Sequence, residues 1–531
     1  MTTAPELPET AAVSEGNKEP TMIFSVEKPW VSVTNTTASE LLPAVLSFVV
    51  RGQQHAPRIF TQRGGVLVRL RDQGHGEVEV LTEKSLKLEL DRAVEFREAS
   101  GLTYRKVKPP ADVVSGILTA DRFPELPQFP ELRRVAQVPY FTSTGNLVMT
   151  FGYHEESRTA LQLPDSLDGL TVPEVLPSFK AVAAAKRLLV EELFVDFPFA
   201  APSSRAHALA LLITPFVRDM LGTTPVPMAA IVAPTVGSGK TKIAHVVSLI
   251  VTGRTAPIMA ADLSREETEK RITALLLEAR PYGVFDNQIE KLDSPVLAAL
   301  LTSDTWSGRL LGQSKMLTLW NTTQWIVTGN NLEFTDEIAR RALTIKLDPK
   351  TDKPNLRTGF KHDPLETWVK AERPALVSAI LVLVQNWLAK GRKEFTARTL
   401  GSFESYARIV GGVLQAAGLD EGFLTETETE HNFSIPAPDA DVDLVRFVKA
   451  WELGLGWQTV TTSQLLDYAH DALFPSGCKD KVVALGRFIQ KNEGRTINGL
   501  RIQPEKVKGE GSRLRNAWRL VDVATEAEAW E

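Results

Sequence analysis

The pattern of hydrophobic and polar residues divides the 531-residue chain into segments of different structure. From residue 21 to residue 108, hydrophobic and polar positions alternate between turn signals, which predicts a β-hairpin about the Gly64-Gly65 pair. Residues 85–94 fit a helix and a strand equally well. This mixture predicts an N-terminal α+β module over residues 21–108, followed by an irregular segment rich in Pro and Gly over residues 109–177.

The middle of the chain alternates between helix-like and strand-like patterns. Residues 178–191 and 203–221 have hydrophobic residues three and four positions apart, which predicts two helices. Five short apolar runs follow, with helical patterns between several of them, so residues 178–350 are predicted to form an α/β core with two entry helices. In residues 351–424 large hydrophobic side chains recur at helical spacing, which predicts an all-helical region.

The C-terminal part begins after an acidic, Pro-containing linker over residues 425–441. Residues 442–524 contain three helical patterns and then two strand-like runs, an order typical of a winged-helix domain. Between Lys479 and Arg519 there are eleven Lys and Arg residues and four acidic ones, although the whole chain has a net charge of −5. This local excess favours binding of DNA phosphates over the alternative, a merely solubilising basic face. The residues that we assign to DNA contact here are Arg495, Arg501, Lys506, Lys508, Arg513 and Arg515.

Composition limits the classes of protein to which the chain can belong. Its 43% hydrophobic content suits a globular protein with several cores, and its single cysteine, Cys478, excludes a disulfide framework and a cysteine-cluster zinc finger. No apolar run reaches the roughly 18–20 residues of a membrane span. Residues 1–20 lack the basic and apolar regions of a signal peptide, so we expect a disordered tail on a cytoplasmic protein with no membrane partner.

The most specific motif is a glycine-rich loop between a strand-like and a helical run, with the sequence PTVGSGKT at residues 234–241. Glycines let backbone N–H groups surround phosphates, and the N-terminus of the following helix adds the positive end of its dipole. The loop predicts ATP as the ligand: Lys240 would bind the β- and γ-phosphates, and the Thr241 hydroxyl would hold Mg²⁺. Pro234 replaces the first glycine of the usual motif. The residues that we assign to nucleotide binding are Gly237, Ser238, Gly239, Lys240 and Thr241.

Further strand-like runs place chemical groups beside this loop. An apolar run over residues 282–286 ends at Asp286, whose carboxylate would hold Mg²⁺ as a Walker B aspartate does. The next run ends in the sequence TGNN, where Asn330 would orient the attacking water. Arg340 and Arg341 directly precede the fifth run, and an arginine at that place typically reaches the nucleotide of a neighbouring subunit.

Together these motifs resemble the replicative AAA+ helicases of phages and mobile genetic elements, relatives of the superfamily 3 and minichromosome-maintenance helicases. The resemblance is strong over residues 203–424 and weaker over residues 121–153. It implies an AAA+ P-loop ATPase core with a helical lid over residues 351–424. Arg373 in this lid is a candidate to reach the nucleotide, and the alternative is an exposed helical arginine with no such role. It also implies homohexameric rings that translocate on single-stranded and forked or duplex DNA by ATP hydrolysis, and leaves room for a primase or loader as a partner. Asn287 departs from the pattern, since it stands where many AAA+ proteins have the catalytic glutamate.

Three functions fit these residues. The leading interpretation is an ATP-dependent hexameric DNA helicase or replication initiator. The alternatives are an AAA+ ATPase that remodels proteins or acts in defence signalling, and a monomeric P-loop NTPase, which the arginine pair disfavours because a subunit-bridging arginine serves no purpose in a monomer. Residues 309–319 distinguish the first two, because they predict a hairpin that in the resembled helicases carries a basic residue into the central pore. Lys315 is the residue placed to do so, and an ordinary structural hairpin is the alternative.

Overall fold

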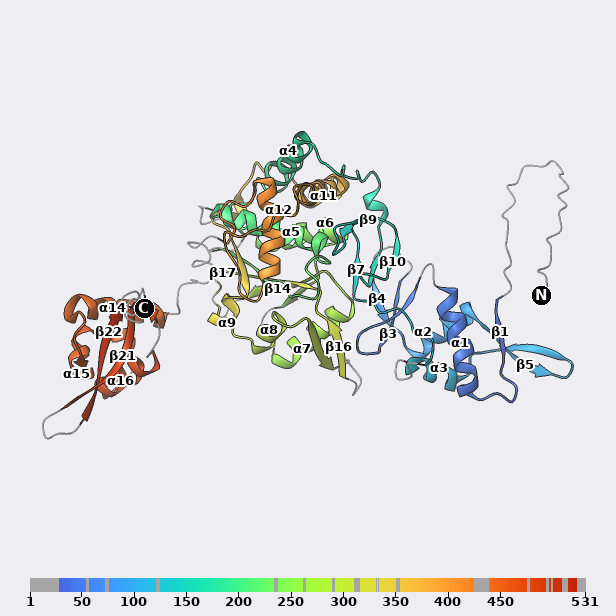
Figure 1. Cartoon of the computed structure of the whole chain (residues 1–531), viewed down its shortest axis with the longest axis horizontal. Helices are drawn as coiled ribbons and strands as arrows, with labels where there is room; N and C mark the ends of the chain where they lie inside the picture. The colour runs from blue at the N-terminus through green and yellow to red at the C-terminus, as the bar shows by residue number, and fades with distance from the viewer. Residues whose placement is uncertain are drawn as a thin grey trace. The chain divides into compact units, whose positions relative to one another are not determined.

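The chain forms two compact units. The structure, a computed structural model, describes residues 28–53, 57–71, 76–120, 125–233, 237–260, 264–288, 292–309, 316–330, 332, 334–349, 354–424, 439–474, 478–492, 496–497, 500–508 and 514–522. Unit 1 comprises Met1–Pro57 and Leu81–Phe129, and unit 2 comprises Arg58–Val80 and Pro130–Glu531. Figure 1 shows their elements coloured in chain order.

The described residues of unit 1 form three α-helices and a three-stranded sheet. The helices are α1 (Ala38–Gly52), α2 (Glu83–Ala93) and α3 (Ala111–Leu118), and the strands, in the order β1-β5-β6, are β1 (Trp30–Ser32), β5 (Glu95–Ser100) and β6 (Thr103–Val107). Helix α2 settles the ambiguity of residues 85–94. The Thr82 hydroxyl accepts a hydrogen bond from the Ser85 backbone N–H at 3.2 Å, and Leu86 and Leu90, one helical turn apart, are both fully buried.

The first strands of unit 2 come from residues that the sequence pattern groups with the N-terminal module. They form a sheet of order β2-β3-β4, with β2 (Ile59–Thr61), β3 (Leu67–Leu70) and β4 (Val78–Val80). Strands β2 and β3 are antiparallel, so the predicted hairpin about Gly64-Gly65 is confirmed. These strands pack in unit 2 because buried Phe60 and Val68 belong to one hydrophobic cluster with Trp325 of the central sheet.

The segment predicted to be irregular contains short strands as well as loops. They are β7 (Arg134–Ala136), β8 (Tyr140–Phe141), β9 (Leu147–Val148), β10 (Gly152–His154) and β11 (Thr159–Leu161), followed by a 3-10 turn at Asp165–Leu167. Each of these strands has only two or three residues. Such strands are too short to give a period-two pattern that a sequence can reveal.

A five-stranded parallel sheet is the centre of unit 2, which confirms the predicted α/β core. Its order is β13-β14-β17-β12-β18, with β12 (Met228–Ala233), β13 (Ile258–Ala260), β14 (Tyr282–Gln288), β17 (Gln324–Asn330) and β18 (Ala342–Lys346). Strand β17 lies between β12 and β14. Because the strands are parallel, the residues that follow all three lie at the same edge of the sheet.

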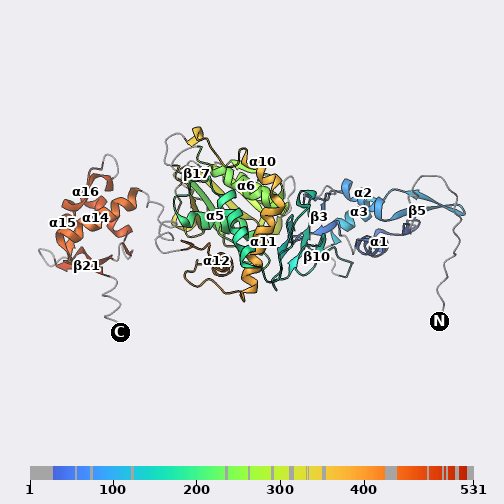
Figure 2. The same ribbon diagram turned by 90° about the horizontal axis from the view of Figure 1, so that it is seen from above.

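Two hydrophobic clusters cover the two faces of this sheet. Successive residues of β12 face opposite sides: Ala230 shares a cluster with Ile272 of α7, whereas Ile231 shares one with Val247 of α6. One face of the sheet is covered by helices α5, α6, α11 and α12. The other face is covered by α7, α8 and the hairpin β15–β16 (Figures 1 and 2). The bounds of these and the neighbouring elements are α4 (Phe179–Arg187, continued by a π-helical turn at Leu188–Leu193), α5 (Pro202–Val217), α6 (Lys240–Thr252), α7 (Arg265–Leu277), α8 (Pro295–Leu300), β15 (Thr305–Arg309), β16 (Met316–Trp320), α9 (Asp336–Ala339), a 3-10 turn at Pro354–Leu356, α10 (Leu365–Ala371), α11 (Arg373–Ala389) and α12 (Glu404–Ala417).

The C-terminal segment has its own hydrophobic cluster, in which Phe447, Trp451 and Trp518 are buried. Its elements are α14 (Asp439–Leu455), β19 (Val460–Thr461), α15 (Thr462–Leu465), two 3-10 turns (Leu466–Tyr468 and Asp471–Leu473), α16 (Lys481–Lys491), β20 (Thr496–Ile497), β21 (Leu500–Lys508) and β22 (Leu514–Asp522). The strands pair antiparallel in the order β19-β22-β21-β20. None of the helices in the described ranges is long and apolar enough to cross a membrane.

Candidate functional site

The glycine-rich loop joins the end of β12 to the start of α6. Residues 234–236 lie outside the described ranges, which resume at Gly237. Gly237 (φ +80°) and Gly239 (φ +94°) have left-handed backbone conformations, which favour glycine. Gly239 is the N-cap of α6, a helix of 13 residues that begins at Lys240. The N–H groups of its first turn have no helical partners and lie at the positive end of the helix dipole, which suits them to a phosphate group.

Two residues from separate motifs meet at this loop. The Nζ atom of Lys240 donates a hydrogen bond to Oδ1 of Asn330 at 2.6 Å. Lys240 is only 8% exposed, and this burial lowers the pKa of its ammonium group, while the charge of Asp286 acts to raise it. The structure thus brings the loop lysine and the amide at the end of β17 together.

The carboxylate of Asp286 lies beside Thr241, the last residue of the glycine-rich motif. Its Oδ1 atom accepts hydrogen bonds from Oγ1 of Thr241 at 2.8 Å and from Oγ1 of Thr328 at 2.6 Å. The two residues predicted to hold Mg²⁺, Thr241 and Asp286, therefore have their oxygen atoms in contact. Hydroxyl and carboxylate oxygens, supplemented by nucleotide phosphates and water, are ligands that suit Mg²⁺, so these residues fit the metal.

Thr328 belongs to the site, although its role was missed in the sequence. Its hydroxyl donates to Asp286 and accepts a hydrogen bond from the backbone N–H of Asn287 at 2.9 Å. Asn287 has a left-handed conformation (φ +59°), and the pairing of β14 with β17 shifts after Phe285, so a bulge turns the end of β14. The available signal was the position of Thr328 two residues before Asn330, which places both side chains on one face of the strand.

The two arginines that follow α9 differ in their surroundings. The Nη1 atom of Arg341 pairs with Oε1 of Glu337 at 2.9 Å, and the Arg341 side chain is only 11% exposed. Arg340 is exposed and forms no ion pair with any residue that the structure describes. The structure therefore separates two residues that are indistinguishable in the sequence.

Arg373 does not have the role considered for it in a lid. Its side chain is buried, and its Nε and Nη2 atoms donate to the carbonyl oxygens of Ile250 (2.9 Å) and Val251 (3.2 Å) at the C-terminal end of α6. Nη2 also donates to the carbonyl oxygen of Gln137, and Nη1 donates to the Ser166 hydroxyl. The expectation that Arg373 reaches the nucleotide is wrong, because its guanidinium group caps the end of α6 opposite the glycine-rich loop.

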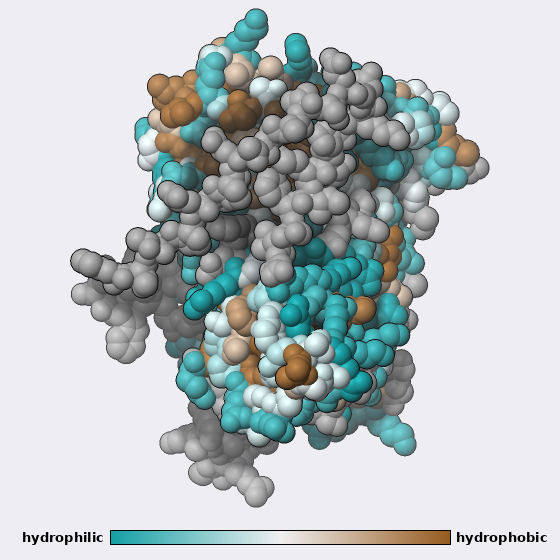
Figure 3. All heavy atoms as spheres, turned by 90° about the vertical axis from the view of Figure 1, so that its right-hand side faces the viewer, coloured by the Kyte–Doolittle hydropathy of each residue, from teal (hydrophilic) through white to brown (hydrophobic). Residues whose placement is uncertain are grey.

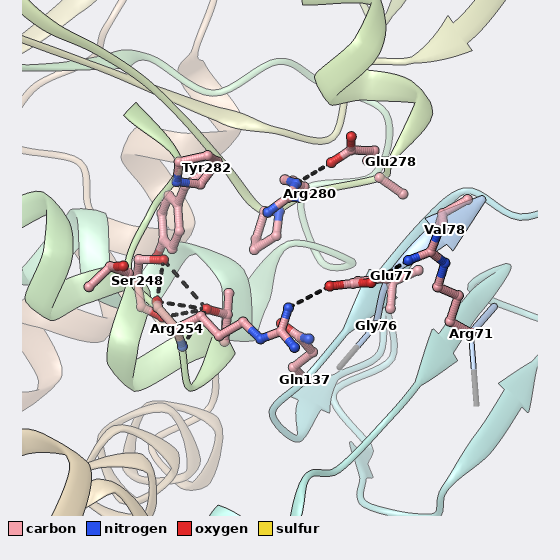
Figure 4. Close-up of a pocket in the computed structure, with 16 residues that line it drawn as sticks. Arg71, Gly76, Glu77, Val78, Gln137, Ser248, Arg254, Glu278, Arg280 and Tyr282 are labelled. Atoms are coloured by element: carbon pink, nitrogen blue, oxygen red, sulfur yellow. Dashed lines mark hydrogen bonds and ion pairs between the residues drawn. The ribbon is translucent and has the colours of Figure 1, made fainter. Parts of the chain in front are cut away.

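A cavity of about 290 Å³ opens beside this same far end of α6 (Figure 4). Its charged lining residues are Arg71, Glu77, Arg254, Glu278 and Arg280. Nη1 of Arg254 pairs with Oε1 of Glu77 at 2.6 Å, and Arg280 pairs with Glu278. The residues assigned to nucleotide binding do not line this cavity, so it is distinct from the candidate site.

The hairpin β15–β16 is anchored at its base, whereas its tip lies in residues 310–315, outside the described ranges. Lys315, the predicted pore residue, belongs to that tip. At the base, Nε1 of Trp320 donates to Oε1 of Glu131 at 2.8 Å, and the guanidinium group of Arg63 lies 4.1 Å from the centre of the Trp320 ring. A Cβ atom at Gly64 would lie 2.8 Å from the backbone nitrogen of Thr318, so the β2–β3 turn packs directly on β16.

The residues predicted to contact DNA in the C-terminal segment are only partly described. Arg495 and Arg513 lie outside the described ranges. The backbones of the other four belong to the long hairpin of β21 and β22, in which Lys506 pairs with Asn516 and Val507 pairs with Arg515. Arg501 and Lys508 also lie on β21, so the strands carry these four positions along one ribbon.

No family model matches the sequence, and no curated protein matches it either. Among solved structures, the chain is similar to the apo A form of the NrS-1 C-terminal region, with 10% identity, 89% of this chain and 98% of that chain covered, and a TM-score of 0.41. It is also similar to the SCCmec type IV Cch helicase, with 14% identity, coverages of 88% and 93%, and a TM-score of 0.35. A third match is JCV helicase with a bound acetamide compound, with 14% identity, coverages of 49% and 73%, and a TM-score of 0.21.

Proposed function

We propose that the protein is an ATP-dependent DNA helicase or replication initiator of a phage or mobile genetic element, acting as a homohexameric ring. The observation that carries the proposal is the contact of Lys240 with Asn330 and of Asp286 with Thr241 and Thr328, at one edge of a parallel sheet. Hydrolysis of a nucleoside triphosphate needs a cation for the phosphates, oxygen ligands for Mg²⁺ and a polar group for the attacking water. These side chains supply all three.

Each residue of this set has a distinct task in the proposed reaction. Lys240 would bind oxygens of the β- and γ-phosphates, because its ammonium group lies at the N-terminus of α6. Thr241 and Asp286 would hold Mg²⁺, which neutralises charge on the phosphates. Thr328 would keep the Asp286 carboxylate in one orientation, and Asn330 would direct a water molecule at the γ-phosphate.

The active site is proposed to be shared between subunits. Arg341 is held within its own chain by Glu337, whereas Arg340 is exposed without an ion pair to a described residue. We therefore assign to Arg340 the role of reaching the nucleotide of the neighbouring subunit, where it would stabilise transition-state charge.

Contact with DNA is assigned to two places. Lys315, at the tip of the β15–β16 hairpin, would contact the strand in the pore. The C-terminal segment would act as a winged-helix domain: its helices α14, α15 and α16 precede a long antiparallel hairpin, and its sequence carries a local excess of basic residues. Phosphate contacts of this kind weaken steeply with salt, because binding releases counterions.

The test uses a labelled forked DNA and mixtures of variants. The purified protein should separate the strands with ATP, and Lys240→Ala should not. Mixing Arg340→Ala with Lys240→Ala should restore part of the ATP turnover, since one kind of mixed interface has both groups intact. Arg341→Ala should keep turnover of its own and gain none on mixing, because it retains both Lys240 and Arg340. ATP turnover that DNA does not stimulate, without strand separation, would favour the alternative of an AAA+ ATPase in protein remodelling or defence signalling.

A further inference from the structure

One face of the unit 1 sheet carries two exposed aromatic side chains. Trp30 begins β1 and is 43% exposed, and Tyr104 in β6 is 53% exposed. Their ring centres are 5.2 Å apart with an angle of 48° between the planes. On the opposite face Val31 and Phe96 are buried in the core. Burial in the unit therefore does not explain why two large aromatic residues lie on the outer face.

Positive side chains surround this aromatic pair. The guanidinium carbon of Arg97 lies 5.0 Å from the centre of the Trp30 ring, and Arg97 pairs with Glu95 at 2.9 Å. The hydrogen bond from Arg97, together with the charges of Arg97, Lys106 and Lys28, lowers the pKa of the Glu95 carboxyl group. Arg97 and its cross-strand neighbour Lys106 thus lie on the face that holds the aromatic rings.

A groove of about 760 Å³ runs along β6 in the same unit. Its charged lining residues are Lys87, Asp91, Arg105, Lys106 and Lys108, four cations and one anion. Asp91 pairs with Lys106 at 3.6 Å, and Arg105 is paired with a glutamate, whereas Lys87 and Lys108 form no ion pair with a described residue. Lys106 belongs both to the groove and to the cations about the rings, so the two features are continuous.

The hairpin that carries Tyr104 is accessible to a ligand. In both ribbon views β5 and β6 extend beyond the helices of unit 1 (Figures 1 and 2). The space-filling view from this side shows small hydrophobic patches set among hydrophilic side chains (Figure 3). The two exposed rings and the neighbouring cationic groove favour a polyanion that also has flat apolar groups.

We propose that this surface binds single-stranded nucleic acid, with bases stacked on Trp30 and Tyr104 and phosphates held along the cations of the groove. Exposed aromatic rings beside a positively charged groove are the two elements of binding sites for single strands. A duplex cannot use the rings, because its bases are stacked inside the helix. The inference deepens the proposed function and rests on it for the kind of partner, the DNA strand that a helicase separates.

The experiment measures binding of a fluorescein-labelled 20-nucleotide oligothymidylate to the full-length protein by fluorescence anisotropy, without nucleotide. Trp30→Ala combined with Tyr104→Ala should raise the Kd for this strand at least about tenfold, because removing each stacking ring weakens binding. The Kd for a blunt duplex of equal length should change less than about twofold. Trp30→Phe with Tyr104→Phe should bind the single strand like the wild type, since phenylalanine rings also stack.

The matched control is Phe179→Ala, which removes an aromatic ring that is 90% exposed at the start of α4 in unit 2 and should leave single-strand binding unchanged. Lys87→Gln with Lys108→Gln should lower the dependence of log Kd on log salt by about 1.4, or about 0.7 for each phosphate that a lysine no longer neutralises. Either an unchanged Kd in the alanine pair or no binding of oligothymidylate by the wild type would overturn the inference. Loss of oligomers with intact DNA binding would also overturn it and identify the face as a subunit contact.

Failure of the proposed helicase function can be distinguished from failure of the proposed binding surface. If the wild type hydrolyses no ATP and separates no strands, while the alanine pair still loses affinity for the single strand, then the proposed function is wrong and the binding surface stands. The same comparison in a Lys240→Ala background should give the same loss of affinity, because the aromatic face does not depend on ATP.

Discussion

The two ends of α6 hold basic side chains in opposite ways. At the N-terminal end, Lys240 lies among an amide, a carboxylate and backbone N–H groups, an arrangement that a phosphate can enter. At the C-terminal end, Arg373 donates four hydrogen bonds to groups of its own chain. We infer that a buried cation can serve chemistry where its surroundings admit a ligand, whereas it serves folding where the chain itself supplies the acceptors.

The largest effect on folding is expected from Arg373. Arg373→Met keeps much of the side-chain volume but leaves the carbonyl oxygens of Ile250 and Val251 without their donor. Buried acceptors without a partner cost about 1–3 kcal/mol each, so we expect a loss of about 3–5 kcal/mol in the free energy of unfolding. Denaturant unfolding measures it. A loss below about 1 kcal/mol would show that the cap does not stabilise this end of α6.

A buried histidine, His207, tests the same comparison, because an imidazole can lose its charge on burial whereas an arginine keeps it. His207 of α5 bonds through Nδ1 to the carbonyl oxygen of Thr344 at 2.8 Å, and burial lowers its pKa to about 4. An unfolded histidine has a pKa of about 6.5, so the unfolded chain takes up a proton first as the pH falls. The free energy of unfolding should therefore decrease by about 3 kcal/mol between pH 7 and pH 4 from this residue alone.

His207→Asn keeps a donor for the Thr344 carbonyl and removes the titrating group. Its free energy of unfolding should fall less over this pH range than that of the wild type. Parallel pH profiles for the two proteins would contradict the assignment.

At the N-terminal end of α6, Thr328→Val tests whether the orientation of the Asp286 carboxylate affects ATP turnover. The substitution keeps the shape of the side chain but removes the hydroxyl that bonds to Asp286. We expect ATP turnover to fall about 10–100-fold, the usual effect of losing a group that orients a metal ligand, with little change in ATP affinity. Thr268→Val, which removes a buried hydroxyl bonded to the Ser264 carbonyl in α7, is the control. If Thr328→Val hydrolysed ATP as fast as Thr268→Val, Thr328 would have no role in orienting Asp286.

The smallest effect is expected from the ion pair beside the cavity at the far end of α6. Arg254 and Glu77 are 42% and 38% exposed, and pairs of this kind contribute about 0–1 kcal/mol. Glu77→Gln should therefore change the midpoint of denaturant unfolding only slightly and leave ATP turnover unchanged. A large loss of turnover would show that this pair is coupled to the glycine-rich loop.

The local features of the proposed nucleotide site could be predicted from the sequence. The glycine-rich loop, Asp286 and Asn330 each lie at the end of an apolar run, and short-range patterns are enough to find them. Thr328 could not be assigned, because its role depends on the bulge in β14 and on the pairing of two strands about 40 residues apart. The cap that Arg373 forms on α6 could not be predicted for the same reason, since its partners lie more than 100 residues away in the sequence.

The same distinction between short-range patterns and long-range contacts holds for larger features of the fold. The hairpin about Gly64 could be predicted from its own turn, but its packing on β16 depends on contacts that only the folded chain defines. The separate surroundings of Arg340 and Arg341 likewise follow from Glu337, one helical turn away from Arg341. The pore contact of Lys315 and the DNA contacts of the C-terminal segment stay predictions.

ATP turnover of two lysine variants of α6 tests the central claim most directly. Lys240 faces the site, whereas Lys242, two residues further on, is 47% exposed and pairs with Glu366 at 3.3 Å. We expect Lys240→Ala to lose about a thousandfold or more in turnover, because the γ-phosphate loses its charge partner, and Lys242→Ala to stay within about twofold of the wild type. Turnover near the wild-type rate in purified Lys240→Ala would contradict the assignment of this end of α6 as a nucleotide-hydrolysing site.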